Sequence, residues 1–142
     1  MKLYAKQPIK TDRAQFTLSG RVRSKKNSKQ MILRGGKPRI ISSSAFQAWE
    51  TQARAELFLQ KRSLENAGQV FPIKGNLCLT ISFGMKGRAH EPDLSNLIEG
   101  PQDILQELGV IENDKQITKI VASKKMDDIF DHCEITISKT GV

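Results

Sequence analysis

Apolar and polar positions alternate along several stretches of the chain, and this period of two predicts β-strands. The alternating stretches are residues 16–23, 76–83, 116–123 and 133–137. Two shorter apolar runs, 31–33 and 38–41, flank a basic turn in which Gly35 and Gly36 can take positive φ. These two runs therefore predict a β-hairpin.

A helical period appears twice. Apolar side chains recur three or four residues apart at Phe46, Trp49, Ala53 and Leu57. They predict an amphipathic helix over residues 44–61, with Ser44 and Gln47 as a capping box. We expect Trp49 to lie in the core rather than to act as a platform for base stacking. The helical pattern ends at residues 66–68.

The second predicted helix covers residues 94–108, with Asp93 as its N-cap and Gly109 just past its end. At 100° per residue its apolar positions gather on one side: Leu97, Ile98, Pro101, Ile104, Leu105 and Leu108. The other side carries Asn96, Glu99 and Asp103. Because proline removes a backbone hydrogen bond, we expect a kink at Pro101.

Together these elements predict one α+β domain, with a mostly antiparallel mixed sheet and two helices packed on it. A chain of 142 residues can bury a core of its own. We expect residues 1–15 and 139–142 to be poorly ordered or peripheral. No apolar run is long enough to span a membrane, and no secretory signal is visible. Cys78 and Cys133 stand alone, so we expect reduced thiols in a cytoplasmic protein.

The net charge of +8 is divided unevenly along the chain. Residues 1–92 hold 18 Lys/Arg and 5 Asp/Glu, whereas residues 93–142 hold 5 Lys/Arg and 10 Asp/Glu. Between Arg21 and Arg39 there are eight basic residues and no acidic one. Such a basic half is typical of a protein with a polyanionic partner, although a solvated basic surface has the same composition.

The acidic half suggests a metal site. Two carboxylates about 4 Å apart repel by roughly 4 kcal/mol at an effective dielectric near 20. A cluster built from Asp93, Asp103 and Asp114 would persist only if it were protonated, paired with Lys or Arg, or bound to a hard cation such as Mg²⁺. Solvated helix acids remain the alternative, because spacing alone does not show whether Asp93 and Asp114 meet.

The motifs in this region resemble those of the RusA-type Holliday junction resolvases. That family has an Asp-x-Asp-Asn-Leu opening, then Asp-x-Leu, then Gly-x-x-x-Asp-Asp-x-Gln-Val. The corresponding segments here are 93–97, 103–105 and 109–117. The family's polar Lys/Ser-Asn loop is matched by residues 24–28, and its later lysine by Lys124. The order of elements agrees from Phe16 to Ile137.

This chain departs from the family pattern in several places. Ser95 stands where the opening has its second aspartate, Glu99 where the family has a lysine, and Asn113 where the closing pair begins. The proline that commonly precedes the N-terminal loop is absent. We interpret the first two changes as an exchange in which Glu99 supplies the metal ligand that Ser95 cannot. The exchanged lysine leaves Lys124 and Lys115 as candidates for the cation that stabilises the transition state.

The resemblance implies a homodimeric, Mg²⁺-dependent endonuclease (Mn²⁺ being a possible substitute) that resolves branched DNA in recombination and repair. Asp93, Asp114 and Glu99 would hold the metal, and Asp103 and Lys124 would complete the catalytic set. We expect Asp93 and Asp114 to share one pocket. The DNA would be held by a largely basic set: Arg21, Arg23, Lys25, Lys26, Asn27, Lys29, Arg34, Lys37, Arg39, Lys86, Arg88, His90 and Asn96.

Three alternatives stay open at this point. The chain could bind branched DNA or other nucleic acid without cutting it, since three positions depart from the family pattern. It could be a metal-dependent nuclease for flaps, single strands or RNA. It could also be a basic scaffold that contacts another protein through its acidic half.

Overall fold

The computed structural model describes residues 12–24 and 29–140, and within them a four-stranded sheet forms the centre. Its strands are β1 (Arg13–Ser19), β4 (Leu77–Gly84), β5 (Ile117–Lys125) and β6 (His132–Lys139). Their spatial order is β1-β6-β4-β5, antiparallel except for the parallel pair β4–β5. The predicted α+β class and the mostly antiparallel mixed sheet are therefore confirmed.

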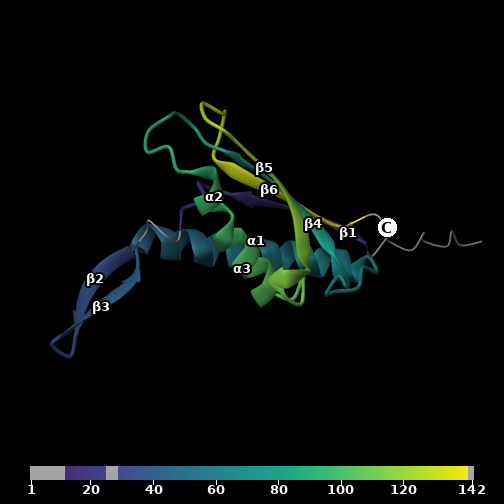
Figure 1. Ribbon diagram of the computed structural model, residues 1–142, viewed down its shortest axis with the longest axis horizontal. Helices are drawn as coiled ribbons and strands as arrows, with labels where there is room; N and C mark the ends of the chain where they lie inside the picture. The colour runs from purple at the N-terminus through teal and green to yellow at the C-terminus, as the bar shows by residue number, and fades with distance from the viewer. Residues whose placement is uncertain (1–11, 25–28, 141–142) are drawn as a thin grey trace, which may run out of the picture.

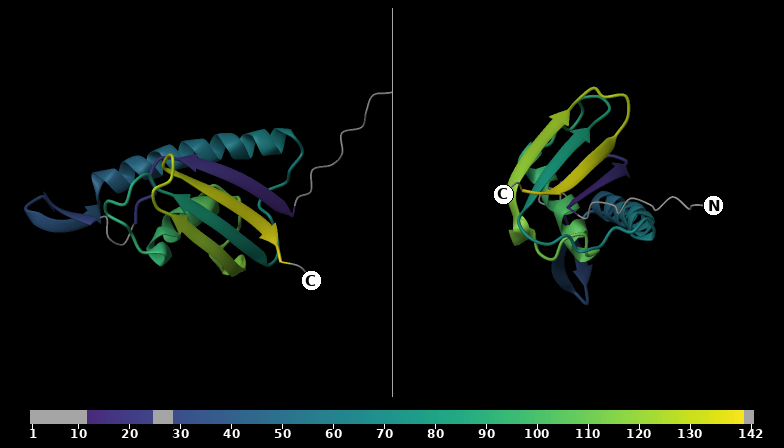
Figure 2. Two further views of the ribbon diagram at one scale, coloured as in Figure 1. Left: turned by 90° about the horizontal axis from the view of Figure 1, so that it is seen from above. Right: turned by 90° about the vertical axis from the view of Figure 1, so that its right-hand side faces the viewer.

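Helices cover one face of this sheet (Figure 2). They are α1 (Ser44–Asn66), the short α2 (Leu94–Leu97) and α3 (Glu99–Glu107), and a 3₁₀ turn, η1 (Asp114–Gln116), leads into β5. Every second residue of β1, β4 and β6 points into the core beneath the helices. Trp49 is buried there as expected, only 5% exposed. Within the described residues, no helix is both long and apolar enough to cross a membrane.

Tertiary pairing moves several element ends away from their predicted positions. β1 begins and ends three or four residues earlier than predicted, because its register with β6 runs from Arg13 to Ser19 and Gly20 then turns the chain at a φ of +82°. Residues 13–15, expected to be poorly ordered or peripheral, pair in this strand, and Ala14 is buried. Lys139, also expected to be peripheral, ends β6. Residues 1–11 and 141–142 lie outside the described residues.

The first helix starts at the predicted residue but is longer than predicted. Its N-cap is Ser43 rather than Ser44, and the Ser43 hydroxyl accepts a hydrogen bond from the Phe46 amide at 3.2 Å. The helix continues to Asn66, five residues beyond the predicted end, because Leu57 and the half-buried Leu64 keep its apolar side on the sheet. The chain then turns at Gly68, where the sequence pattern breaks.

The predicted single helix over 94–108 is two helices that meet at Ile98. Pro101 lies in the first turn of α3, where its missing amide hydrogen breaks no bond, so it starts a helix instead of kinking one. The neighbouring Gly100 brings this turn against the core: a β-carbon there would lie 3.0 Å from the Trp49 ring. Gly109 ends α3 with a φ of +74°, as predicted.

The two edges of the sheet differ. Along β1, the edge is covered by polar side chains of α1: the Gln60 amide bonds both the N–H (2.8 Å) and the C=O (2.7 Å) of Thr17, and Glu56 accepts from the Ser19 N–H at 3.1 Å. Along β5, no hydrogen bond to the outer edge is found within the described part of the chain. An uncovered strand edge is a ready site for pairing with another strand.

The predicted hairpin stands apart from the sheet. Its strands, β2 (Lys29–Arg34) and β3 (Lys37–Ser42), pair only with each other, and they project beyond the start of α1 (Figure 1). Gly35 and Gly36 form its turn at φ values of 60° and 75°, as the sequence predicts.

The covered edge of β1 leads to a stability prediction. Gln60→Ala removes both bonds to the Thr17 backbone, and we expect it to lower the free energy of unfolding by about 1–2 kcal/mol. Ser63→Ala, at an exposed position on the same helix, is the matched control and should change it little. Urea unfolding followed by circular dichroism measures both, and equal midpoints would contradict the edge role of Gln60.

Candidate functional site

Asp93 lies at the end of the sheet where β4 and β5 finish, immediately before α2. It holds the N-cap position that the sequence predicts, but its side chain makes no cap hydrogen bond. Instead, the Asn96 amide approaches the Asp93 carboxylate at 3.5 Å, while the Asn96 backbone N–H bonds the Asp93 carbonyl at 3.1 Å. The carboxylate is exposed and therefore open to a ligand from solvent.

Lys124 fixes the segment that precedes Asp93. Its ammonium donates to the Pro92 carbonyl at 2.7 Å and pairs with the Glu91 carboxylate at 2.8 Å. The hydrogen bond from Lys124 lowers the pKa of Glu91. A lysine near the end of β5 thus ties Asp93 to the sheet, and the sequence offered no sign that Glu91 would be its partner.

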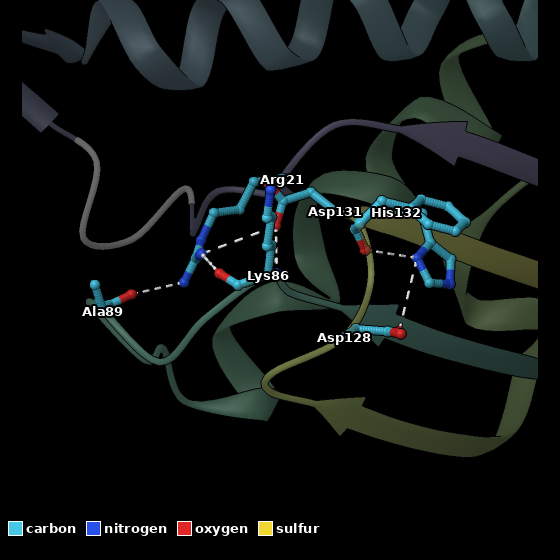
Figure 3. Close-up of polar contacts among 7 residues, drawn as sticks. Arg21, Lys86, Ala89, Asp128, Asp131 and His132 are labelled. Carbon is cyan, nitrogen blue, oxygen red and sulfur yellow. Dashed lines mark hydrogen bonds and ion pairs between the residues drawn. The ribbon is translucent and has the colours of Figure 1, made fainter.

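Arg21 holds three loops together at the same end of the sheet (Figure 3). Its guanidinium donates to the carbonyls of Lys86 (3.3 Å) and Ala89 (2.7 Å) and lies 3.8 Å from Asp131. Asp131 in turn accepts the Lys86 backbone N–H at 2.8 Å. Arg21, predicted as a DNA contact, is therefore largely occupied in positioning the loop that leads to Asp93.

A second acidic residue of the same turn, Asp128, faces His132, with 3.9 Å between the carboxylate and the ring. His132 also contacts the Phe130 carbonyl at 3.1 Å and stacks against the Phe130 ring. The sequence marked this region only as a turn, because nothing in its spacing indicated that its acids would pair with Arg21 and His132.

A basic hollow of about 380 Å³ lies beside Asp93. It is lined by Arg21, Val22, Arg23, Ser24, His90, Glu91 and Pro92. Arg23 and His90 are exposed, and His90 has a φ of 56°, which turns the chain sharply just before the acidic segment. Three of the predicted DNA-binding residues, Arg21, Arg23 and His90, therefore border the candidate site.

Asp114 lies at the opposite end of β5. It begins η1, where Asn113 caps the turn by accepting the Lys115 N–H at 2.8 Å, and its own N–H bonds the Gln106 side chain at 2.8 Å. Ile117 and Lys124 are seven strand positions apart, which is about 23 Å at 3.3 Å per residue. Since Asp93 adjoins Lys124 and Asp114 precedes Ile117, the two carboxylates are far apart in one chain.

The expectation that Asp93 and Asp114 share a pocket is thus wrong for a single chain. The physical reason is the parallel pairing of β4 and β5, which separates the start of the connecting segment from its end by the length of the strand. In the described ranges 12–24 and 29–140, no group of three or more His, Cys, Asp and Glu residues could hold a metal ion.

The remaining predicted residues divide between these regions. Glu99 is exposed at the start of α3, and Asp103 is exposed one turn further on with a polar partner of its own. Lys86 and Arg88 lie in the loop before Asp93, where Arg88 pairs with Asp127. On the hairpin, Arg34, Lys37 and Arg39 are exposed. Lys25, Lys26 and Asn27 lie outside the described residues, as does the side chain of Lys29.

A model of the family Endodeoxyribonuclease RusA matches residues 19–138. Enzymes of this family are Holliday junction resolvases, which act on branched DNA and depend on a divalent metal ion. A search of curated proteins found no match. Because the matched residues make up most of the chain and include every acidic motif described above, the chain belongs to the RusA family of endodeoxyribonucleases.

Proposed function

We propose that this enzyme resolves Holliday junctions as a Mg²⁺-dependent homodimer in which each active site is completed by both chains. One observation carries the proposal: Asp93 and Asp114 lie at opposite ends of β5, whose outer edge pairs with no strand among residues 12–24 and 29–140. A family nuclease that needs a metal must bring its carboxylates together, and one chain leaves them about 20 Å or more apart.

The free edge of β5 favours a second copy as its partner. Its Ile120 and Val121 side chains are 46% and 48% exposed near the middle of the strand. The opposite edge, β1, is covered by Gln60 and Glu56, so it is closed to pairing. Twofold dimers use the same patch on both subunits, and an open strand edge with central apolar residues meets that requirement.

Antiparallel pairing of two β5 strands would reverse their ends. The amino end of one strand, which follows Asp114, would then lie beside the carboxyl end of the other, where Lys124 ties down the segment before Asp93. Each end of the joined sheet would carry Asp93 from one chain and Asp114 of the partner subunit. Two such sites related by a twofold axis suit a substrate cut symmetrically on two strands.

The donors present fit a hard divalent cation only in such a pair. Carboxylate oxygens are the ligands that Mg²⁺ prefers, and Mn²⁺ accepts them as well. Asp93 and Glu99 would come from one chain and Asp114 from its partner. A bound Mg²⁺ supplies polarisation of the phosphate and a water of lowered pKa. Lys124 orients the Asp93 segment and, with Lys115 of the partner subunit, offers positive charge for the phosphate.

DNA binding is assigned to the basic surfaces around this end of the sheet. The hollow beside Asp93 presents Arg23 and His90, and the hairpin projects from the same end with Arg34, Lys37 and Arg39 exposed. Contacts of this kind bind the phosphate backbone and give little sequence selectivity, so affinity is expected to fall steeply with salt.

A non-catalytic branched-DNA-binding protein is the second candidate, favoured by the absence of a metal-binding group within the described part of one chain. Four-way junctions incubated with and without Mg²⁺ distinguish the two candidates. Nicking that requires the metal supports the enzyme, and binding without nicking over a range of metals supports the alternative. Flaps, single strands and RNA in the same assay test for other substrates.

The shared site predicts complementation between two inactive variants. Asp93→Asn and Asp114→Asn homodimers should bind junctions but not cut them, because each change removes a charge with little loss of volume. Heterodimers of the two variants, co-expressed with different tags and purified through both, should recover about half of the wild-type nicking rate, since one of their two sites is then intact.

The control is a heterodimer of wild type with Asp93→Asn, which keeps one intact site whether sites are shared or not. Heterodimers of the two variants that stay as inactive as the homodimers, beside an active control, would contradict the shared site. Gel assays that separate single nicks from paired cuts measure all of these species.

The hypothesis that Glu99 supplies the metal ligand that Ser95 cannot gives a second prediction. Glu99→Gln keeps the shape of the side chain and removes its charge, so we expect junction cleavage to fall about 10- to 100-fold, with more Mg²⁺ needed for half-maximal rate. Glu134→Gln, at an exposed position of β6, is the matched control and should cleave normally. A wild-type Mg²⁺ dependence in Glu99→Gln would remove Glu99 from the site.

A further inference from the structure

The β2–β3 hairpin has two chemically different faces. In its antiparallel register Met31 lies opposite Ile40 and Leu33 opposite Pro38, so these four apolar side chains share one face. The next pairs, Ile32 with Arg39 and Arg34 with Lys37, place three cations on the other face. The apolar runs and the cations are both visible in the sequence, but the strand register is what places them on opposite faces.

The apolar face has no partner in the described part of the chain. Met31, Leu33 and Ile40 are 70%, 76% and 72% exposed, among the highest values for large apolar residues in this protein. β2 and β3 pair only with each other, and the hairpin projects away from the sheet and helices (Figures 1 and 2). An isolated two-stranded hairpin is only marginally stable, so a contact on this face is expected to order it.

Charge identifies the kind of partner. The region from Arg21 to Arg39 contains eight basic residues and no acidic one, and the hairpin extends from the end of the sheet that carries Asp93 and the basic hollow. An interface with an ordinary protein would not require a segment that carries basic residues and no acidic one, whereas an interface with a polyanion would. DNA also offers an apolar surface wherever its bases are unstacked.

The residue types on the apolar face fit that surface. Proteins that bend or open DNA insert Phe, Leu, Ile, Met or Pro between base steps, and all four residues here belong to that set. Stacked duplex exposes no base faces, but the centre of a four-way junction does when its arms separate. A face of this kind would thus distinguish a branch point from a continuous duplex.

We propose that the apolar face of the β2–β3 hairpin packs against unstacked bases at the branch point of a DNA junction, while its basic face contacts the flanking phosphates. This inference rests on the proposed function and adds the element that selects branched over linear DNA. It assigns the selection of DNA structure to Leu33, Ile40 and Met31, and general affinity to Arg34, Lys37 and Arg39.

The test uses full-length protein without divalent metal and a four-way junction carrying 2-aminopurine at the branch point. The fluorescence of this base rises when it is unstacked, so wild type should raise it. Leu33→Thr with Ile40→Thr removes apolar surface and places β-branched residues, which favour strands, at both positions. At saturating protein this variant should lose the rise, and its preference for junction over duplex should fall about tenfold, the equivalent of burying one or two aliphatic groups.

The matched control changes the opposite face. Arg34→Gln with Lys37→Gln should weaken binding to junction and duplex alike and reduce the salt slope by about two, while the fluorescence rise at saturation remains. Circular dichroism melting checks that both variants are folded. Met31→Thr alone should shift the fluorescence in the same direction as the double apolar change.

The outcomes distinguish failure of the hairpin proposal from failure of the proposed function. A full fluorescence rise in the Leu33→Thr, Ile40→Thr variant overturns the hairpin proposal. A change in the oligomeric state of this variant with unaltered junction preference also overturns it, because the apolar face would then bind a second copy of the chain instead of DNA. Wild-type protein that cuts junctions without raising the fluorescence overturns this proposal alone. Wild-type protein that does not bind branched DNA overturns the proposed function and the hairpin proposal together.

Discussion

The parallel pairing of β4 with β5 is the constraint on which the rest of the arrangement depends. Two parallel strands cannot be joined by a tight turn, so the chain must return along the whole sheet before the second strand begins. Here that return contains α2, α3 and η1, with Asp93 near its start and Asp114 near its end. The separation of the two acids is therefore built into the topology. No rotation of their side chains can bring them together within one chain.

The same connection leaves β5 at the rim of the sheet, and no other strand of the described chain pairs with its outer edge. Two features of this strand, the free edge and the exposed Ile120 and Val121, are unfavourable for a lone monomer and natural for a symmetric pair. Antiparallel pairing of two copies reverses the strand ends, and this reversal is the operation needed to reunite Asp93 with Asp114 of the partner subunit. One hypothesis thus accounts for both the split acids and the open edge.

Local sequence signals predict the elements well and their tertiary relations poorly. Alternation located all four sheet strands, and the positions of Gly35, Gly36 and Gly109 fixed a turn and a helix end. The division of the second helix at Ile98 was not predictable, because it depends on how Gly100 approaches Trp49, which lies on a different helix. The distance between Asp93 and Asp114 likewise follows from strand order and direction, which no short motif encodes.

The departures from the family pattern can be separated by what each residue does in the fold. Asn113 caps η1 through its side-chain oxygen, a bond that an aspartate would make equally well, so this exchange keeps the turn and removes one negative charge beside Asp114. Ser95 also removes a carboxylate, next to Asp93, whereas Glu99 adds one at the start of α3. Repulsion between neighbouring acids falls with each carboxylate removed. A site with fewer crowded carboxylates needs less positive charge nearby to offset their repulsion. This is consistent with the absence of the family's lysine at the position of Glu99. It is also consistent with Lys124 being used to hold Pro92 and Glu91 in place.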